Sequence, residues 1–407
     1  MYSLLAQHSM ILFASIFSVA IVLKLNWLFI GAPGSDLLGS DIPKSLMLLK
    51  GQNPYSTMPY ASPYPPLLLL VDALIIRVTG GASVAVIAWN IRVAGMLAEL
   101  GSGVLIFLTL RARKVAFTGM LLSTMVFFLD PSISSLNYFF FHSDIFGIFI
   151  LATSLFVLTK NRLGIGLALL GLATIFKVHP ILSIILVAVW LVRRNSLYKS
   201  LPAILPVGAL LVLGLVLPFW IPGYSRSFLG FNLQNGDDGK ASFTLLNLFY
   251  GALPHLWNVT VSSVLVNYVW VACTVSLFVV GLGFVWWNAK KIGPVEVVLL
   301  GLLVWLLPLR ELHPMYLVWM LVPLLMLGRT GLTLLVVGLF DVASVMAHWA
   351  WNVPPNPAPW NVPLNPLPWM TGPLGFFVAG LVFASCSSVA LLAVLCTGGS
   401  GYGRERA

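Results

Sequence analysis

Charged residues are scarce in this chain of 407 residues: Asp, Glu, Lys and Arg make up 8% of it, and only 12 positions are acidic. Soluble globular proteins carry about 25% charged residues. Hydrophobic residues make up 59% of the chain, and its mean hydropathy is +0.98. The shortage of charge therefore excludes a water-soluble globular protein, and lipid must solvate much of the surface.

Cysteine is also rare, and Cys273, Cys386 and Cys396 all lie inside apolar runs without metal-ligand spacing. We interpret them as small buried hydrophobic residues. The sequence has no glycine-rich nucleotide loop, no Ser-His-Asp order and no zinc-site spacing. These absences leave no sequence signal for a soluble nucleotide-binding domain, a serine hydrolase or a zinc site.

The basic residues set the expected topology. The net charge is +10, but the basic residues form short clusters between apolar runs, which is typical of topology determinants rather than of nucleic-acid binding. With the spans given below, all of these clusters fall on one side of the membrane: Arg111, Arg113 and Lys114; Lys160 and Arg162; Arg193 and Arg194; Lys290 and Lys291; Arg329; Arg404 and Arg406. We expect that side, with both termini, to be cytoplasmic.

Apolar runs predict an all-α polytopic membrane protein with about 12 transmembrane helices in a single domain, 1–407. The expected spans are 10–30, 83–110, 115–129, 143–159, 163–178, 181–192, 201–220, 262–287, 294–309, 315–328, 331–349 and 373–397.

The first outer loop, 31–82, is the longest polar interruption in the N-terminal third of the chain. Within it, residues 66–78 are apolar but short for a span, so we expect a helix lying along the outer interface, with Asp72 and Arg77 as its polar contacts. Gly80 and Gly81 would turn the chain into the next span. The outer loop 350–372 is rich in Pro and Trp, and we interpret it as an interfacial anchor rather than a binding site.

Asp36 and Asp41 in the first outer loop are the candidate catalytic acids. Each lies close to the end of the first span, so its depth in the membrane is fixed, and turn and aromatic residues around them indicate a built loop. A partly buried carboxylate can act as a general base for a sugar hydroxyl. Simple solvation in a loop is the alternative for either residue.

Two further segments carry candidate binding residues near helix ends. Asp144 begins a span, where it either caps the helix or binds substrate. Lys177 and His179 lie between two short apolar runs; a lysine in a membrane domain is usually paired or functional, and snorkelling to the headgroups is the alternative.

The segment PLRELHPMY holds the densest polar cluster of the C-terminal half. Arg310 and His313 could hold a phosphate, and Glu311 could orient them or simply close a turn. Within the second span, Arg92 and Glu99 lie on one helical face, and we interpret them, together with Asn90, as contacts between helices. The alternative for Arg92 is contact with a lipid phosphate.

Several of these motifs together resemble GT-C class polyprenol-phosphate-dependent glycosyltransferases, in particular multispanning mannosyltransferase-like proteins. The run GSDIPKSLMLLKGQNPYSTMPYASPYPPLLLL is similar to the first outer loop of that family, through Gly51, Pro54, Tyr55, Tyr64, Pro65 and Pro66. HSDIFGIF, LATIFKVHPILSIIL and RELHPMYLVW are similar to later family segments, and the likeness extends from about residue 34 to 320.

The resemblance implies a function and residue roles. Asp41 would be the general base, with Asp36 as the alternative because Asp41 lies closer to Gly51 than in many members. The reaction would be inverting transfer of a hexose, with mannose as first choice, from a polyprenyl-phosphate or dolichyl-phosphate sugar to a lipid-linked or glycan acceptor. The expected donor-phosphate residues are Lys177, His179, Arg310 and His313; the expected substrate-binding residues are Asp144, Glu311, Tyr55 and Tyr64. No cofactor is required, although a role for a divalent metal is left open.

Two other functions remain open. In-membrane charges and broken helices also suit a transporter or flippase of a lipid-linked or small polar solute, although the candidate polar groups gather on the outer side. The third hypothesis is a structural subunit of a membrane complex. We expect a prokaryotic plasma membrane, an active site facing outside, and no nucleic-acid partner.

Overall fold

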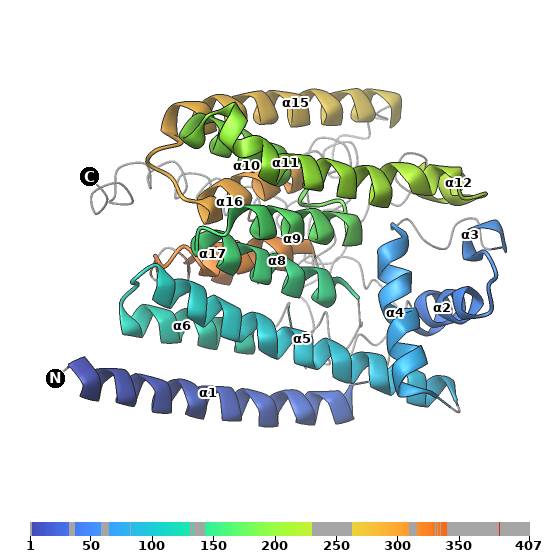
Figure 1. The fold of residues 1–407 in the computed structure, drawn as a ribbon. Helices are drawn as coiled ribbons and strands as arrows, with labels where there is room; N and C mark the ends of the chain where they lie inside the picture. Colours follow the sequence, from blue (N-terminus) through green and yellow to red (C-terminus); the bar gives the residue numbers. More distant parts are fainter. Residues whose placement is uncertain are drawn as a thin grey trace, which may run out of the picture. The chain divides into compact units, whose positions relative to one another are not determined.

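The computed structural model describes residues 2–31, 37–57, 65–81, 83–130, 133, 143–229, 263–308, 316–329, 331, 333, 335–339 and 382. This part of the chain is helical and contains no strand (Figure 1). The helices are α1 (Tyr2–Ile30), η1 (Leu37–Asp41), α2 (Ile42–Leu49), α3 (Pro54–Thr57), α4 (Pro66–Thr79), α5 (Val84–Ala112), α6 (Phe117–Leu129), α8 (Asp144–Thr159), α9 (Leu163–Phe176), α10 (Ile181–Asn195), α11 (Leu197–Leu211), η3 (Val212–Val216), η4 (Leu217–Trp220), α12 (Tyr224–Leu229), α15 (Ser263–Asn288), α16 (Pro294–Leu306) and α17 (Leu317–Leu325).

The all-α prediction is confirmed for the described residues, and each expected span from the first to the one at 315–328 coincides with helix. Within the described residues, four helical segments are long and apolar enough to cross a membrane: Ile11–Ile30, Val84–Ala112, Leu197–Trp220 and Asn267–Asn288. The expected spans at 331–349 and 373–397 and the loop at 350–372 lie almost entirely outside the described residues.

Proline and glycine set several helix boundaries. Helix α4 begins at Pro66, whose missing N–H costs nothing in a first turn, and it ends at Thr79, directly before Gly80, which has φ +67°. Helix α9 ends at Phe176, and α10 begins at Ile181 directly after Pro180. The extended Lys177 between them has φ −150° and ψ 133°, so this lysine lies at a break between helices.

The chain divides into two compact units. The first unit comprises Met1–Val178, Gly208–Phe231 and Leu325–Thr330; the second comprises His179–Val207, Asn232–Leu324 and Gly331–Ala407. In the first unit α8 packs against α5 and α9, α1 packs against α5 and α6, and α4 packs against α2, α5 and α9. In the second unit α10 packs against α15 and α16.

A buried ion pair joins α1 to α5 in the first unit. Lys24 Nζ lies 2.6 Å from Glu99 Oε1, and both side chains are fully buried. Lys24 also lies over the ring of Trp27, 4.5 Å from its centroid. The prediction that Glu99 connects helices is therefore confirmed, and its partner is a lysine on the first helix of the chain.

The first outer loop is tied to a segment far along the chain, at α3 and α12. Asn53 Nδ2 donates to the Pro222 carbonyl at 2.9 Å, and the rings of Tyr55 and Tyr224 meet edge to face at 5.1 Å. A Cβ on Gly223, which has φ +82°, would lie 2.4 Å from the Tyr55 carbonyl oxygen. Glycine at position 223 therefore permits the close approach of the two segments.

We expect Gly223→Ala to destabilise the protein by more than the roughly 1–2 kcal/mol that a left-handed conformation alone costs an L-residue. Gly51→Ala is the matched control for that cost, because Gly51 has φ +72° and a methyl group added to it would meet nothing within 4 Å. Gly208→Ala, in α11 with open space around it, controls for the methyl group itself. Melting temperatures in detergent measure the three effects; equal losses for Gly223→Ala and Gly51→Ala would contradict the close approach.

Candidate functional site

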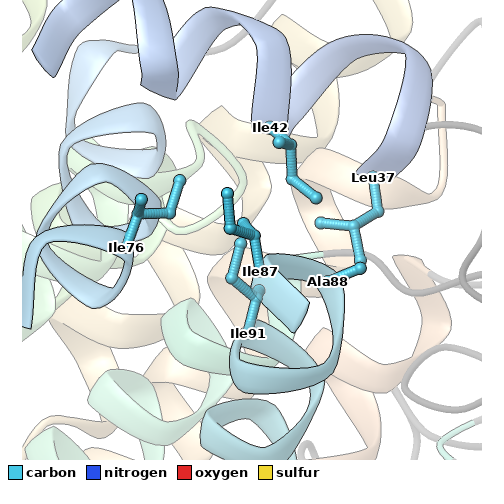
Figure 2. Close-up of a cluster of buried hydrophobic side chains, with 6 residues drawn as sticks. All are labelled: Leu37, Ile42, Ile76, Ile87, Ala88 and Ile91. Carbon is cyan, nitrogen blue, oxygen red and sulfur yellow. The ribbon is translucent and has the colours of Figure 1, made fainter. Parts of the chain in front are cut away.

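Asp41 ends the π-helical turn η1 and directly precedes α2, with only 7% of the residue exposed. Its neighbours Leu37 and Ile42 belong to an apolar cluster formed by η1, α2, α4 and α5 (Figure 2): Leu37, Ile42, Ile76, Ile87, Ala88 and Ile91. The Asp41 carboxylate makes no capping hydrogen bond to α2. The cluster therefore fixes the backbone at Asp41 without using its carboxylate to cap the helix.

Asp72 on α4 is a second acid of the same region. The expectation that it contacts the membrane interface is wrong: Asp72 is fully buried, and Ser143 Oγ donates to its Oδ2 at 3.0 Å. Burial raises the pKa of Asp72 well above its usual range, the negative charge of Asp41 raises it further, and the Ser143 hydrogen bond lowers it. Arg77, the other expected interfacial contact, is exposed.

The sequence carried a signal for the burial of Asp72. The buried residues of α4 are Leu68, Leu69, Asp72, Ala73 and Ile76, a spacing of three and four residues that marks one helical face. Asp72 therefore lies on the apolar stripe that faces the unit's interior. Its hydrogen-bond partner Ser143 is 71 positions away in the sequence, and no local pattern identifies that contact.

Asp144 and Lys177 form a buried ion pair next to Ser143. Lys177 Nζ lies 2.6 Å from Asp144 Oδ2, and the side chains are 3% and 0% exposed. Asp144 is the first residue of α8 and Lys177 directly follows α9, so two neighbouring helices bring the charges together at one end. The structure therefore pairs two of the candidate residues, and Lys177 is not a lysine snorkelling to the surface.

Lys44 is a buried cation that the sequence analysis did not single out. It lies on α2 one turn after Asp41, is only 1% exposed, and donates from Nζ to Ser40 Oγ at 2.6 Å. Its spacing of three residues from Asp41 places the two on the same side of a helical turn. That spacing was the available sequence signal for the pair.

Tyr55 lies in an aromatic cluster rather than at an exposed surface. It is 3% exposed and packs in the first unit with Leu68, Leu69, Phe176 and Tyr224. Among the described residues, neither the Tyr55 nor the Tyr224 hydroxyl has a hydrogen-bond partner. Burial raises the pKa of the Tyr55 hydroxyl, and Tyr224 raises it further; burial likewise raises the pKa of Tyr224. Both hydroxyls therefore stay protonated at neutral pH.

His179 belongs to the second unit and is 7% exposed. Trp305 Nε1 donates to His179 Nδ1 at 3.3 Å, which requires Nδ1 to be unprotonated. The rings of Tyr316 and Trp319 lie 4.6 and 5.7 Å from the imidazole. The expected phosphate-binding role of His179 stays a prediction.

The first unit thus brings Asp41, Asp72, Ser143, Asp144 and Lys177 into one polar cluster, which we call the acid cluster. The remaining candidate residues lie outside the described part of the chain: Asp36, Tyr64, Arg310, Glu311 and His313. Within the described ranges, no group of three or more His, Cys, Asp or Glu residues could hold a metal ion.

The acid cluster combines a carboxylate pair, which can accept a proton, with a buried lysine, which can stabilise a developing negative charge. Its residues come from η1, α4, α8 with the serine before it, and the end of α9, so packing of the first unit determines their geometry. A scan against protein-family models gives no match, and a search of curated proteins gives none either.

Proposed function

We propose that the protein is a membrane glycosyltransferase that moves a hexose, with mannose as first choice, from a polyprenyl-phosphate or dolichyl-phosphate sugar to a lipid-linked or glycan acceptor. The observation that carries this proposal is the acid cluster, in which the buried Asp41 lies near Asp72 and the chain of contacts continues through Ser143 to the Asp144–Lys177 pair. The likeness of the first outer loop to GT-C enzymes supports the choice of donor.

In the proposed reaction, Asp41 takes the proton of the acceptor hydroxyl as its oxygen attacks the anomeric carbon of the donor sugar. The bond from that carbon to the phosphate oxygen breaks, and its electron pair leaves with the polyprenyl phosphate. Attack from the face opposite the phosphate inverts the anomeric configuration. Removing the acceptor proton avoids a positively charged oxygen in the transition state.

The leaving phosphate gains negative charge, and Lys177 is proposed to stabilise that charge. His179, Arg310 and His313 are proposed as further phosphate contacts, and Tyr55, Tyr64, Asp144 and Glu311 as substrate contacts. Asp144, 2.6 Å from the Lys177 ammonium group, would hold the lysine in position. The chemistry needs no nucleotide, because the lipid phosphate is the leaving group.

The proposed setting is a single membrane domain with about 12 spans and an interfacial helix in the first outer loop. Both termini would be cytoplasmic, and the acid cluster would face outside, in a prokaryotic plasma membrane. The basic clusters between the apolar runs support this orientation.

A transporter or flippase of a lipid-linked or small polar solute is the second candidate. The observation that favours it is the fully buried Lys24–Glu99 pair, which joins two helices long enough to span a membrane. Ionisable residues inside a membrane often mark substrate or proton pathways. In the glycosyltransferase proposal the same pair only connects α1 to α5.

The test is sugar transfer by the purified protein in nanodiscs. Polyprenyl-phosphate mannose with a radiolabelled sugar would be offered with crude lipid and glycan acceptors, and a glucose donor would be offered in parallel. We expect radiolabel to enter the acceptor with release of polyprenyl phosphate. No transfer from either donor, together with equilibration of labelled lipid across liposomes, would favour the transporter.

A further inference from the structure

One carboxylate oxygen of Asp72 accepts a hydrogen bond within the described residues, and the other does not. The residue is fully buried, Oδ2 accepts from Ser143 Oγ at 3.0 Å, and Oδ1 has no hydrogen-bond partner in the described part of the chain. A buried ionised carboxylate with an unpaired oxygen is costly, because nothing replaces the water that it has lost. Adding a proton to Oδ1 removes the charge and turns that oxygen into a donor, while Oδ2 remains the acceptor for Ser143.

Asp41 is the acceptor that the neighbouring segment offers to such a donor. It ends η1 directly before α2, α2 packs against α4, and its charge acts on Asp72. Two carboxylates that repel each other in a buried site do not both ionise readily, and a shared proton relieves their repulsion. We propose that Asp72 is a positioning residue, held protonated by its site, which donates from Oδ1 to Asp41 and keeps Asp41 as the ionised acid of the pair.

The elements next to α4 carry other charges. The charged side chains at buried positions of η1, α2 and α5 and at the end of α9 are Asp41, Lys44, Arg92, Glu99 and Lys177. Glu99 is paired with Lys24 and Lys177 with Asp144. Asp41 is the charged neighbour that shifts the proton affinity of Asp72, so the proposal concerns these two acids as a pair.

The consequence for the reaction rests on the proposed function. Below the lower pKa of the pair both acids are protonated, so Asp41 cannot accept a proton. Above the higher pKa both are charged, and Asp72 no longer donates to Asp41. Transfer should therefore be bell-shaped in pH, with Asp72 contributing to the alkaline limb.

Infrared spectroscopy of the full-length protein tests the proton directly and needs no activity. We expect the wild type at neutral pH to show a carboxylic-acid C=O band that is lost in Asp72→Asn. Asp41→Asn should move the disappearance of this band to lower pH, because it removes the repelling charge. Ser143→Ala should move it to higher pH, because it removes the hydrogen bond that favours the ionised form.

Ser45→Ala is the matched control, since Ser45 Oγ also donates to α4, but to the Leu69 carbonyl at 3.2 Å rather than to Asp72. It should leave the band in place. The proposal would be overturned by a difference spectrum, wild type minus Asp72→Asn, that contains carboxylate bands alone. Equal shifts of the band in Ser143→Ala and Ser45→Ala would also overturn it.

Transfer assays then test the role of the proton. Asp72→Asn keeps a donor toward Asp41, so its transfer should fall only a few fold while the alkaline limb moves to higher pH. Asp72→Leu keeps no donor and should lose roughly 10- to 100-fold. Equal losses in the two variants with an unchanged alkaline limb would overturn the positioning role. Absence of transfer by the wild type would contradict the proposed function instead. The infrared result would still decide whether Asp72 is protonated.

Discussion

Asp41→Asn is expected to lower sugar transfer by about 10²–10⁴-fold, the range that a general base contributes to a reaction. Asparagine keeps the shape of the side chain but cannot take the acceptor proton. The apolar cluster of Figure 2 holds the backbone on both sides of Asp41, so the substitution should leave the fold intact. The measurement is the initial rate with saturating donor in nanodiscs, with the melting temperature determined for the same preparation.

Asp36→Asn is the companion variant for this prediction. Both acids lie in the first outer loop, and each is a candidate for the base. Loss of transfer in Asp36→Asn with an active Asp41→Asn would assign the base to Asp36. Loss in Asp41→Asn that is accompanied by a large fall in melting temperature would indicate a structural role for the acid rather than a catalytic one.

The helix boundaries were predictable because their determinants are local. Pro66 begins α4, Gly80 ends it, and Pro180 precedes α10, each through the backbone geometry that the residue itself imposes. The apolar runs predicted the helices between these points for the same reason. A lysine at a break between two apolar runs was likewise visible in the sequence, and this pattern indicated Lys177 as a candidate binding residue.

The acid cluster was only partly predictable because its contacts are distant in sequence. Asp144 lies 33 positions before Lys177, and Ser143 lies 71 after Asp72. Residues 66–78 are too short for a span, and this led to the expectation that Asp72 faces the interface. In the structure α4 packs on α2, α5 and α9, which buries the stripe that carries Asp72. Helical periodicity predicted the stripe, whereas only packing shows what covers it.

Lys177→Met should destabilise the protein by about 3–5 kcal/mol, because it leaves Asp144 charged and buried without its partner. The double variant Lys177→Met with Asp144→Leu removes both charges and should recover most of this loss, since an apolar pair of similar volume often replaces a buried ion pair without cost. Melting temperatures of the two variants measure the recovery. Transfer should stay low in both, because neither has a cation at position 177 to stabilise the leaving phosphate.

The Lys24–Glu99 pair is the matched control, with the same 2.6 Å separation and complete burial but outside the acid cluster. Lys24→Met should destabilise to a similar extent, and Lys24→Met with Glu99→Met should recover both stability and transfer. If the Lys177–Asp144 double variant also recovers transfer, Lys177 is structural and its proposed role toward the phosphate is wrong. If instead the Lys24–Glu99 double variant is stable but inactive in moving labelled lipid across liposomes, the in-membrane pair has the function that a transporter requires.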